Sequence, residues 1–183
     1  MRIIGGTAKG HAIKAPKGVD TRPTLDRVRE SVFNVLANRG IFGTDVLDIF
    51  SGTGAVAIEA LSRGAAHAVA VDFKTGRLIL ENAKHCRVDD RLEIIPRKLS
   101  QLKNYIVGRQ FDYIFSDPPY ESGFIQDTID LVTTYDLLKP EGVLLLEHHK
   151  DEVFALPESW ECIKEQKFGY TMVSYFVNIA ERS

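Results

Sequence analysis

From Asp45 onward, runs of residues typical of β-strands alternate with runs typical of α-helices. The strand-like runs are 46–49, 67–71, 92–95, 111–116 and 143–147, and the helix-like runs are 55–63, 75–85 and 124 to about 135. Two neighbouring parallel strands cannot be joined by a tight turn, so the helix between them serves as the crossover. The alternation therefore predicts an α/β fold, with a mostly parallel sheet covered by helices on both faces.

The pattern changes towards the C-terminus, where two strand-like runs follow each other without a helix. They are 160–168 and 170–180, and Gly169 separates them. Consecutive strands joined by a short turn pair antiparallel, so we expect a hairpin at one edge of the sheet.

The chain has 183 residues, the length of one domain. We expect residues 1–24 to form an N-terminal extension and residues 25–183 to form the main domain, together one globular unit. Gly5-Gly6 and Lys9-Gly10 interrupt short apolar runs in the extension, which predicts a small β-hairpin.

A helix is expected to open the main domain. Thr24 is a suitable N-cap for it, and Gly40 a suitable end. Its apolar face carries Leu25, Val28, Val32, Val35 and Leu36. This spacing has the period of an amphipathic helix that packs on the sheet.

Basic residues are concentrated in the N-terminal part of the chain. Residues 1–40 carry eight Lys and Arg against three Asp and Glu, whereas the remainder carries 15 against 22. Because Lys and Arg neutralise phosphates, this segment is the expected place for nucleic-acid contacts. We assign Lys9, Lys14 and Lys17 to general attraction of nucleic acid, with a merely solvated basic face as the alternative.

Metal sites and membrane segments are not indicated. Cys86 and Cys162 lie far apart, without the spacing of a zinc site or a disulfide framework. His148 and His149 are adjacent in a strand-like region and so point to opposite faces, which disfavours a shared metal. The chain has no apolar run of membrane-spanning length and no N-terminal secretory signal. We expect a cytoplasmic protein that binds neither a metal nor a membrane.

A glycine-containing loop follows the first parallel strand. The segment Asp48-Ile49-Phe50-Ser51-Gly52-Thr53-Gly54 lets the backbone turn sharply and approach a ligand. Asp72 ends the next strand, 20 residues after Gly52, where a carboxylate can bind the two hydroxyls of a ribose. Both features indicate a nucleoside-containing cofactor. An NAD-type loop is the alternative, but Asp48 would repel a pyrophosphate and would instead attract a charged amino group.

The tetrapeptide Asp117-Pro118-Pro119-Tyr120 directly follows the strand-like run 111–116. An ionised carboxylate only accepts hydrogen bonds, and a residue before proline is held extended. Asp117 and the Pro118 carbonyl can therefore present fixed acceptors to a planar amine, beside the aromatic ring of Tyr120. A nucleobase amine needs such acceptors because its lone pair is delocalised into the ring. A proline-rich turn that ends a strand is the alternative interpretation.

The order of these features resembles that of the class I S-adenosylmethionine-dependent methyltransferases, and Asp-Pro-Pro-Tyr is similar to the motif of their amine-methylating branch. Further segments extend the resemblance over nearly the whole chain. They are Thr21-Arg22-Pro23-Thr24, Arg27-Val28-Arg29-Glu30, Phe33-Asn34 and Glu59-Ala60-Leu61-Ser62-Arg63-Gly64-Ala65. Together these segments resemble the RsmD family of bacterial methyltransferases, which act on the N2 amine of a guanine in small-subunit (16S) ribosomal RNA.

The resemblance implies a Rossmann-like methyltransferase fold, a seven-stranded sheet whose last strand is antiparallel, and S-adenosyl-L-methionine as the cofactor. The cofactor-binding residues it implies are Asp48, Ser51, Gly52 and Gly54 near the methionine portion, Asp72 at the ribose, and Phe73 and Leu99 at the adenine. One segment departs from the family, because Arg97 and Lys98 stand where many relatives have an Asp or Asn that accepts from adenine. Neither cation can accept a hydrogen bond, so adenine recognition is expected to rest on backbone groups and Leu99.

The resemblance further implies direct transfer of a methyl group to the exocyclic nitrogen of a base. Asp117 and the Pro118 carbonyl would accept the two N–H bonds of the amine, and Tyr120 would stack on the base beside Pro119. The residues by themselves point only to an exocyclic amine. Methylation of adenine N6 in DNA or RNA is therefore the alternative.

The expected partner is ribosomal RNA within an assembling small subunit, and we expect a monomer. The predicted RNA contacts are Lys9, Lys14, Arg22 and Arg29. For the two arginines a second role is open, namely binding the carboxylate of the cofactor and closing the site.

Overall fold

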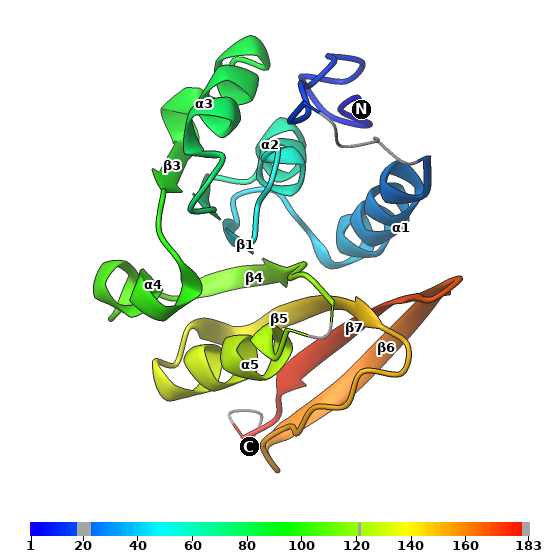
Figure 1. Cartoon of the computed structure of the whole chain (residues 1–183), viewed down its shortest axis with the longest axis vertical. Helices are drawn as coiled ribbons and strands as arrows, with labels where there is room; N and C mark the ends of the chain where they lie inside the picture. Colours follow the sequence, from blue (N-terminus) through cyan, green and yellow to red (C-terminus); the bar gives the residue numbers. More distant parts are fainter. Residues whose placement is uncertain (18–22, 121, 181–183) are drawn as a thin grey trace.

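The computed structural model describes residues 1–17, 23–120 and 122–180. The strands are β1 (Asp45–Ile49), β2 (His67–Val71), β3 (Leu92–Ile95), β4 (Phe111–Ser116), β5 (Leu138–His149), β6 (Trp160–Phe168) and β7 (Thr171–Asn178). Across the described residues these seven strands form one sheet in the order β3-β2-β1-β4-β5-β7-β6 (Figure 1). β1 to β5 pair in parallel, and β7 is antiparallel to both β5 and β6. The predicted α/β class and the C-terminal antiparallel hairpin are confirmed.

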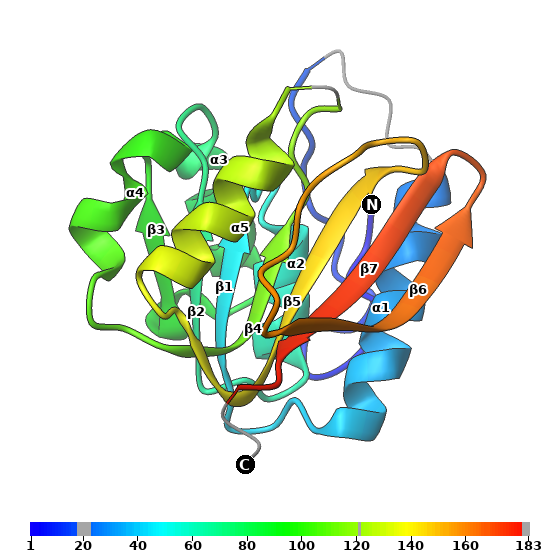
Figure 2. The same ribbon diagram turned by 90° about the horizontal axis from the view of Figure 1, so that it is seen from below.

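Helices cover both faces of the sheet. They are α1 (Pro23–Arg39), α2 (Ala55–Ser62), α3 (Gly76–His85), α4 (Leu99–Ile106) and α5 (Phe124–Thr134), with a short 3-10 helix, η1 (Asp89–Arg91), before β3. The first three pack on one face and α4 and α5 pack on the other, so each face has its own apolar core. Figure 2 shows α5 in front of the sheet and α1 and α2 behind it. None of the described helices is long and apolar enough to cross a membrane.

Strand β1 shows how the sheet serves both cores. Neighbouring residues of a strand point to opposite faces. Val46 therefore faces α1 to α3, whereas Leu47 and Ile49 face α4 and α5. Strands buried on both faces are usually apolar throughout. Asp48 departs from that rule while being only 4% exposed, which marks it as a residue with a specific partner or ligand.

The N-terminal segment folds back on itself antiparallel, as expected from its sequence, but its ladder is short. Arg2 forms an antiparallel bridge with Ala12. The N–H of Ile3 donates to the oxygen of His11, and the N–H of Ile13 donates to the oxygen of Met1, both at 3.0 Å. Gly6 and Gly10 adopt left-handed φ angles of 77° and 85°, which bend the chain away from an extended ladder.

Besides its own antiparallel pairing, the backbone of this segment also donates hydrogen bonds to helix α2. The N–H groups of Ile4 and Gly5 donate to the carboxylate of Glu59 at 2.9 and 2.8 Å. The N–H of Ala8 donates to Ser62 Oγ at 2.9 Å. The apolar side chains of the segment, those of Ile3, Ala8 and Ile13, are buried in the core of the main domain.

The sequence pattern missed helix α4 and most of the length of β5. Leu99, Leu102 and Ile106 have helical spacing and are buried, so the signal for α4 was present. Strand β5 begins at Leu138, five residues before the predicted Val143, and its first part pairs irregularly with β4. Pro140 and Gly142 are rare in strands, so the local pattern contained no strand signal there. The bounds of the other predicted helices lie within two residues of those observed.

Candidate active site

The chain reverses its direction of progress across the sheet between β1 and β4. From β1 it proceeds to β2 and β3 on one side, and from β4 it proceeds to β5 on the other. In open α/β sheets, ligands bind beyond the carboxyl ends of the strands at such a switch point. Two cavities of the described structure open at this place.

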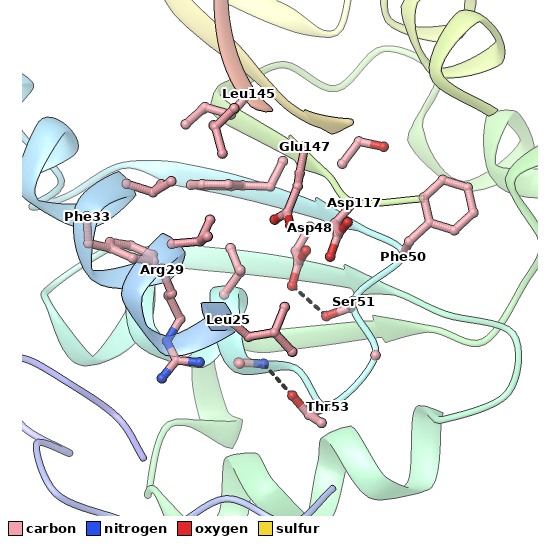
Figure 3. Close-up of a pocket in the computed structure, with 18 of the residues that line it drawn as sticks. Leu25, Arg29, Phe33, Asp48, Phe50, Ser51, Thr53, Asp117, Leu145 and Glu147 are labelled. Atoms are coloured by element: carbon pink, nitrogen blue, oxygen red, sulfur yellow. Dashed lines mark hydrogen bonds between the residues drawn. The ribbon is translucent and has the colours of Figure 1, made fainter. Parts of the chain in front are cut away.

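The first cavity, of about 220 Å³, lies between α1 and the carboxyl ends of β1, β4 and β5. Figure 3 shows the carboxylates of Asp48, Asp117 and Glu147 directed into it. The apolar part of its wall includes Leu25, Val28, Val32, Phe33, Phe115, Leu145 and Val173. Three acidic groups are thus gathered against a mainly apolar surface.

The second cavity, of about 400 Å³, lies at the carboxyl ends of β1, β2 and β3 and reaches the loop after β4. Its lining includes Asp72, Phe73, Lys74, Arg97, Lys98, Leu99, Pro118 and Pro119. The two cavities share Phe50 and Asp117 and therefore meet at the ends of β1 and β4. An elongated ligand can lie across both cavities, with Asp117 beside its middle.

The loop after β1 brings backbone to the edge of the first cavity. Phe50 and Gly52 have left-handed φ angles of 60° and 59°, a conformation that is costly for a residue with a side chain such as Phe50. A Cβ at Gly52 would meet nothing within 4 Å, so the loop leaves open space at the cavity. Gly54 is not part of either lining; a Cβ there would lie 2.9 Å from Ile79 Cγ2. Gly54 therefore allows α2 to pack closely on α3.

Asp72 fixes the loops around the second cavity. Its Oδ2 accepts from the N–H of Gly52 at 3.1 Å, and its Oδ1 accepts from the N–H groups of Lys74 and Thr75 at 2.9 and 3.2 Å. A carboxylate has about four lone-pair sites, so Asp72 keeps acceptor capacity for a ligand hydroxyl. The neighbouring Phe73 is half exposed and presents an apolar ring to the same cavity.

Asp48 is a buried carboxylate with hydrogen bonds but no cation. Its Oδ2 accepts from Ser51 Oγ at 2.6 Å and from the N–H of Ala57 at 3.2 Å. Burial raises the pKa of Asp48 to about 7; the two hydrogen bonds lower it, and the charges of Asp117 and Asp72 raise it. None of the Lys and Arg side chains in the described ranges pairs with Asp48. A positively charged ligand group would therefore stabilise its ionised form.

Asp117 and Glu147 lie side by side at the ends of adjacent strands. β4 pairs in parallel with β5, with Ser116 beside Leu146, so the next residue of each strand faces the first cavity. The Asp117 side chain is exposed at the cavities, whereas Glu147 is half-buried. Desolvation by the surrounding protein raises the pKa of Asp117 well above the usual range, and the Glu147 carboxylate raises it further. Burial likewise raises the pKa of Glu147 to about 7.

Tyr120 lies at the rim of the site and is not part of either cavity lining. Its hydroxyl forms a hydrogen bond of 2.7 Å with Thr171 Oγ1, and its ring meets that of His149 edge-on, with centroids 5.8 Å apart. The side chain remains 46% exposed. The predicted stacking surface is therefore at the mouth of the site, held by the start of β7.

Arg29 differs in position from the RNA or cofactor contact expected of it. It is 5% exposed, and its guanidinium donates to the backbone oxygen of Arg2. It also forms ion pairs with Asp26 and Glu59 at 3.2 and 3.5 Å. Its stem lines the first cavity, but Figure 3 shows the guanidinium directed away from Asp48. This geometry favours a structural role, which ties α1 to the N-terminal segment.

The predicted lysine contacts lie on the surface. Lys9, Lys14 and Lys17 are exposed, and Lys14 Nζ lies 3.7 Å from a carboxylate oxygen of Glu81. Such an exposed pair is weak and can open to a phosphate. Arg22 lies outside the described residues.

Phe50 and Glu147 belong to the site but were not predicted from the sequence. Glu147 follows the apolar run 143–146 as Asp117 follows the run 111–116, so an acid at the carboxyl end of a parallel strand was a usable signal. The left-handed φ of Phe50 had no such signal, because aromatic residues rarely adopt it.

The chemistry of the donor set suits an organic ligand with a positive charge near the three carboxylates and hydroxyls near Asp72. Phe73 and Leu99 provide apolar surfaces for a planar ring in the second cavity. In the described part of the chain, no group of His, Cys, Asp and Glu is arranged to hold a metal ion.

The antiparallel β7, inserted between β5 and β6, separates this sheet from the all-parallel sheet of dinucleotide-binding dehydrogenases. The two cavities that meet at the Asp-Pro-Pro segment are a second difference from those dehydrogenases, because they suit a nucleoside in one cavity and an amine in the other. The fold is that of a class I methyltransferase. A model of the family described as conserved hypothetical protein 95 matches residues 1–177. The chain belongs to this family, the RsmD family that its motifs resembled.

Curated relatives and solved structures agree with this assignment. The ribosomal RNA small subunit methyltransferase D of Escherichia coli K12 is 31% identical, covering 92% of this chain and 85% of the relative. The protein of the same name from Haemophilus influenzae is 32% identical, covering 96% and 91%. The solved structure of yhhF from Escherichia coli has a TM-score of 0.86 at 28% identity and covers 99% of both chains. That of HI0767 from Haemophilus influenzae has a TM-score of 0.82 at 28% identity, covering 97% and 98%.

Proposed function

We propose that the protein transfers a methyl group from S-adenosyl-L-methionine to the exocyclic N2 amine of a guanine in small-subunit ribosomal RNA. The observation that carries this proposal is the position of Asp117, which borders both cavities and so lies between a nucleoside-sized site and a second, mainly apolar one. The relatives named ribosomal RNA small subunit methyltransferase D support ribosomal RNA as the substrate.

The residues of the two cavities fit this cofactor. Asp72 would accept from the ribose hydroxyls, and Phe73 and Leu99 would contact the adenine. Asp48 would receive the amino group of the methionine portion, because a cation relieves the cost of its buried charge. When bound, the cofactor supplies a methyl group made electrophilic by its positively charged sulfur.

Asp117 and the Pro118 carbonyl would orient the target amine. By accepting its two N–H bonds, they direct the nitrogen lone pair away from themselves and draw it out of the ring. As the carbon–nitrogen bond forms and the carbon–sulfur bond breaks, positive charge develops on the nitrogen, and the Asp117 carboxylate stabilises it. The surplus proton of the methylated amine then passes to Asp117, whose raised pKa suits a proton acceptor, or to water.

The target base must leave its stack before its amine can reach the site. Tyr120, at the mouth of the site, would stack on the extruded base, while Lys9 and Lys14 would attract the phosphates of the RNA. The protein is small, and its basic residues for holding RNA are concentrated in the N-terminal part of the chain. This supports RNA within an assembling subunit as the substrate, because ribosomal proteins can help to present it. We propose that the protein acts on it as a monomer.

The test is incubation of the purified protein with labelled S-adenosylmethionine and either naked small-subunit RNA or assembling subunits, followed by nucleoside analysis. We expect label in N2-methylguanosine, with faster incorporation in assembling subunits. Label in N6-methyladenosine would replace guanine by adenine as the target. Calorimetry provides the control for the cofactor: binding of NAD without binding of S-adenosylmethionine would contradict the proposal.

A further inference from the structure

Glu147 is the acidic residue of the first cavity to which methyl transfer itself gives no role. It lies side by side with Asp117, and Figure 3 shows both carboxylates directed into the cavity. Adjacent strands are about 4.8 Å apart. Two acceptors with this spacing can meet two neighbouring N–H donors on one edge of a planar ring.

The protein around Glu147 leaves its carboxylate available. Across the described residues, no hydrogen-bond donor or cationic side chain is paired with it. Arg29, the cation that lines the same cavity, is bound to Glu59 and to the backbone of Arg2. The neighbouring wall, with Leu145 among its residues, is apolar. A polar group in such surroundings costs free energy unless it is hydrogen-bonded, so a donor on the ligand would be strongly favoured.

Asp48, the third carboxylate, is less able to accept a hydrogen bond from the target base. Its Oδ2 is already occupied by Ser51 Oγ and the N–H of Ala57. It is also bonded into the loop after β1, which borders the proposed cofactor. The base-facing acceptors of the cavity are therefore Asp117 and Glu147.

Guanine and adenine differ in the atom beside their reactive amine. Guanine carries an N1–H donor next to its N2 amine, whereas adenine carries a bare N1 acceptor next to its N6 amine. An ionised carboxylate can only accept. We propose that Glu147 accepts the N1–H of the target base and thereby selects guanine over adenine, an inference that rests on the proposed methylation of guanine N2.

The test uses 2-aminopurine, which keeps the 2-amino group of guanine but has an acceptor at N1. RNA segments carry either guanine or 2-aminopurine at the position that nucleoside analysis identifies as methylated. The measurement is kcat/KM for each RNA at about pH 8, where a carboxyl with a pKa of about 7 is mainly ionised. We expect the wild type to prefer guanine by about tenfold or more, the effect of one hydrogen bond to a charged group.

The decisive variant is Glu147→Gln. Its amide can accept from N1–H of guanine and can also donate to N1 of 2-aminopurine. We therefore expect faster transfer to 2-aminopurine than the wild type shows, and a guanine preference that falls towards one. Each enzyme meets both RNAs, so a folding defect lowers both rates and leaves their ratio unchanged. Glu161→Gln, an exposed change on β6, serves as the control and is expected to keep the wild-type ratio.

Two results would overturn the inference while leaving the proposed function in place. One is a wild type that methylates guanine and 2-aminopurine equally well. The other is a Glu147→Gln enzyme that keeps the wild-type preference. If the wild type binds S-adenosylmethionine but methylates no RNA, the proposed function and the inference fall together.

Discussion

At the scale of single residues, the site depends on carboxylates whose pKa the surrounding protein raises. Asp48 and Glu147 both have a pKa raised to about 7, and burial is the largest cause in each case. Asp117 is exposed at the cavities, but the apolar surroundings also raise its pKa, and the charge of Glu147 raises it further. An ordinary surface carboxylate would be ionised and hydrated at neutral pH, and it would bind a cation or an amine weakly. Desolvation makes each of these groups a stronger partner for a ligand.

Asp117→Ala is the variant that tests the proposed chemistry. Removing an acceptor aimed at developing charge should lower the rate of transfer to guanine about 100- to 1,000-fold. The affinity for S-adenosylmethionine should change only a few-fold, since Asp72 and Phe73 are untouched. Single-turnover kinetics and calorimetry measure the two effects separately. Asp90→Ala, at a largely exposed position, should leave both unchanged; a rate for Asp117→Ala equal to that of this control would contradict the mechanism.

Two glycines in the N-terminal segment allow the cost of backbone strain to be measured apart from the cost of a steric clash. Gly6 and Gly10 have similar φ angles, 77° and 85°. A Cβ at Gly6 would lie 1.8 Å from the backbone oxygen of Ser62, whereas one at Gly10 would meet nothing within 4 Å. We expect Gly10→Ala to lower the free energy of unfolding by about 1 kcal/mol, from strain alone. Gly6→Ala should cost at least about 3 kcal/mol, because backbone must move. Urea unfolding measures both, and equal losses would be inconsistent with this contact.

At the scale of elements, one buried side chain, that of Glu59, attaches the N-terminal segment to helix α2. Glu59 is fully buried and accepts from the N–H groups of Ile4 and Gly5 and from Arg63 Nε. It also pairs with Arg29 of α1. One carboxylate therefore joins the segment, α1 and α2, and so helps to hold α1 over the first cavity.

Glu59→Ala should therefore be severely destabilising. It leaves the buried Arg29 without its innermost counter-charge and two backbone N–H groups without an acceptor, which together should cost about 3–5 kcal/mol of unfolding free energy. The matched control is Glu81→Ala, which removes an exposed partner of Lys14 and should cost less than about 1 kcal/mol. Limited proteolysis of Glu59→Ala should cut first within residues 1–17. A loss no larger than that of the control would show that the network contributes little.

Local patterns predicted most elements, but not the contacts between distant segments. The alternation of strand-like and helix-like runs was sufficient for the fold class and the parallel pairing, because each crossover repeats the same local signal. The acids within β1 and after β2 and β4 were predicted because they interrupt or end apolar runs. The hydrogen bonds of Glu59 to Ile4 and Gly5 join residues more than 50 positions apart, and no periodicity reports such a contact. The antiparallel turn of the extension was predicted, but its attachment to α2 was not, for that reason.

At the scale of the whole molecule, the sheet brings four carboxylates together at the carboxyl ends of its parallel strands. Asp48, Asp72, Asp117 and Glu147 each stand at or near the carboxyl end of a different parallel strand, and all face one of the two cavities. A parallel topology places these ends together whatever the distance along the sequence. The cost is mutual repulsion among carboxylates, which an apolar wall intensifies. The free protein should therefore be less stable when these groups are ionised.

The pH dependence of cofactor binding follows from this arrangement. The charged side chains that line the first cavity are Asp48, Asp117, Glu147 and Arg29. The guanidinium of Arg29 is paired with Glu59 and with the backbone of Arg2. In the unfolded chain the carboxyls lose their protons near about pH 4, whereas Asp48 and Glu147 in the folded protein keep theirs up to about 7. These two groups thus bind more protons in the folded state in this window, so their contribution to the stability of the free protein falls as the pH rises from about 4 to about 7.

A cationic cofactor reverses that trend, because it favours the ionised carboxylates. Below about pH 7 its binding must release protons, so its affinity should fall as the pH is lowered from about 8 to about 5.5. Calorimetry in buffers of different ionisation enthalpy measures both the affinity and the protons released. S-adenosylhomocysteine, which lacks the sulfonium charge, should show a weaker dependence, and so should Asp48→Asn. An affinity that stays constant over this range would mean that Asp48 does not meet the charged amino group of the cofactor.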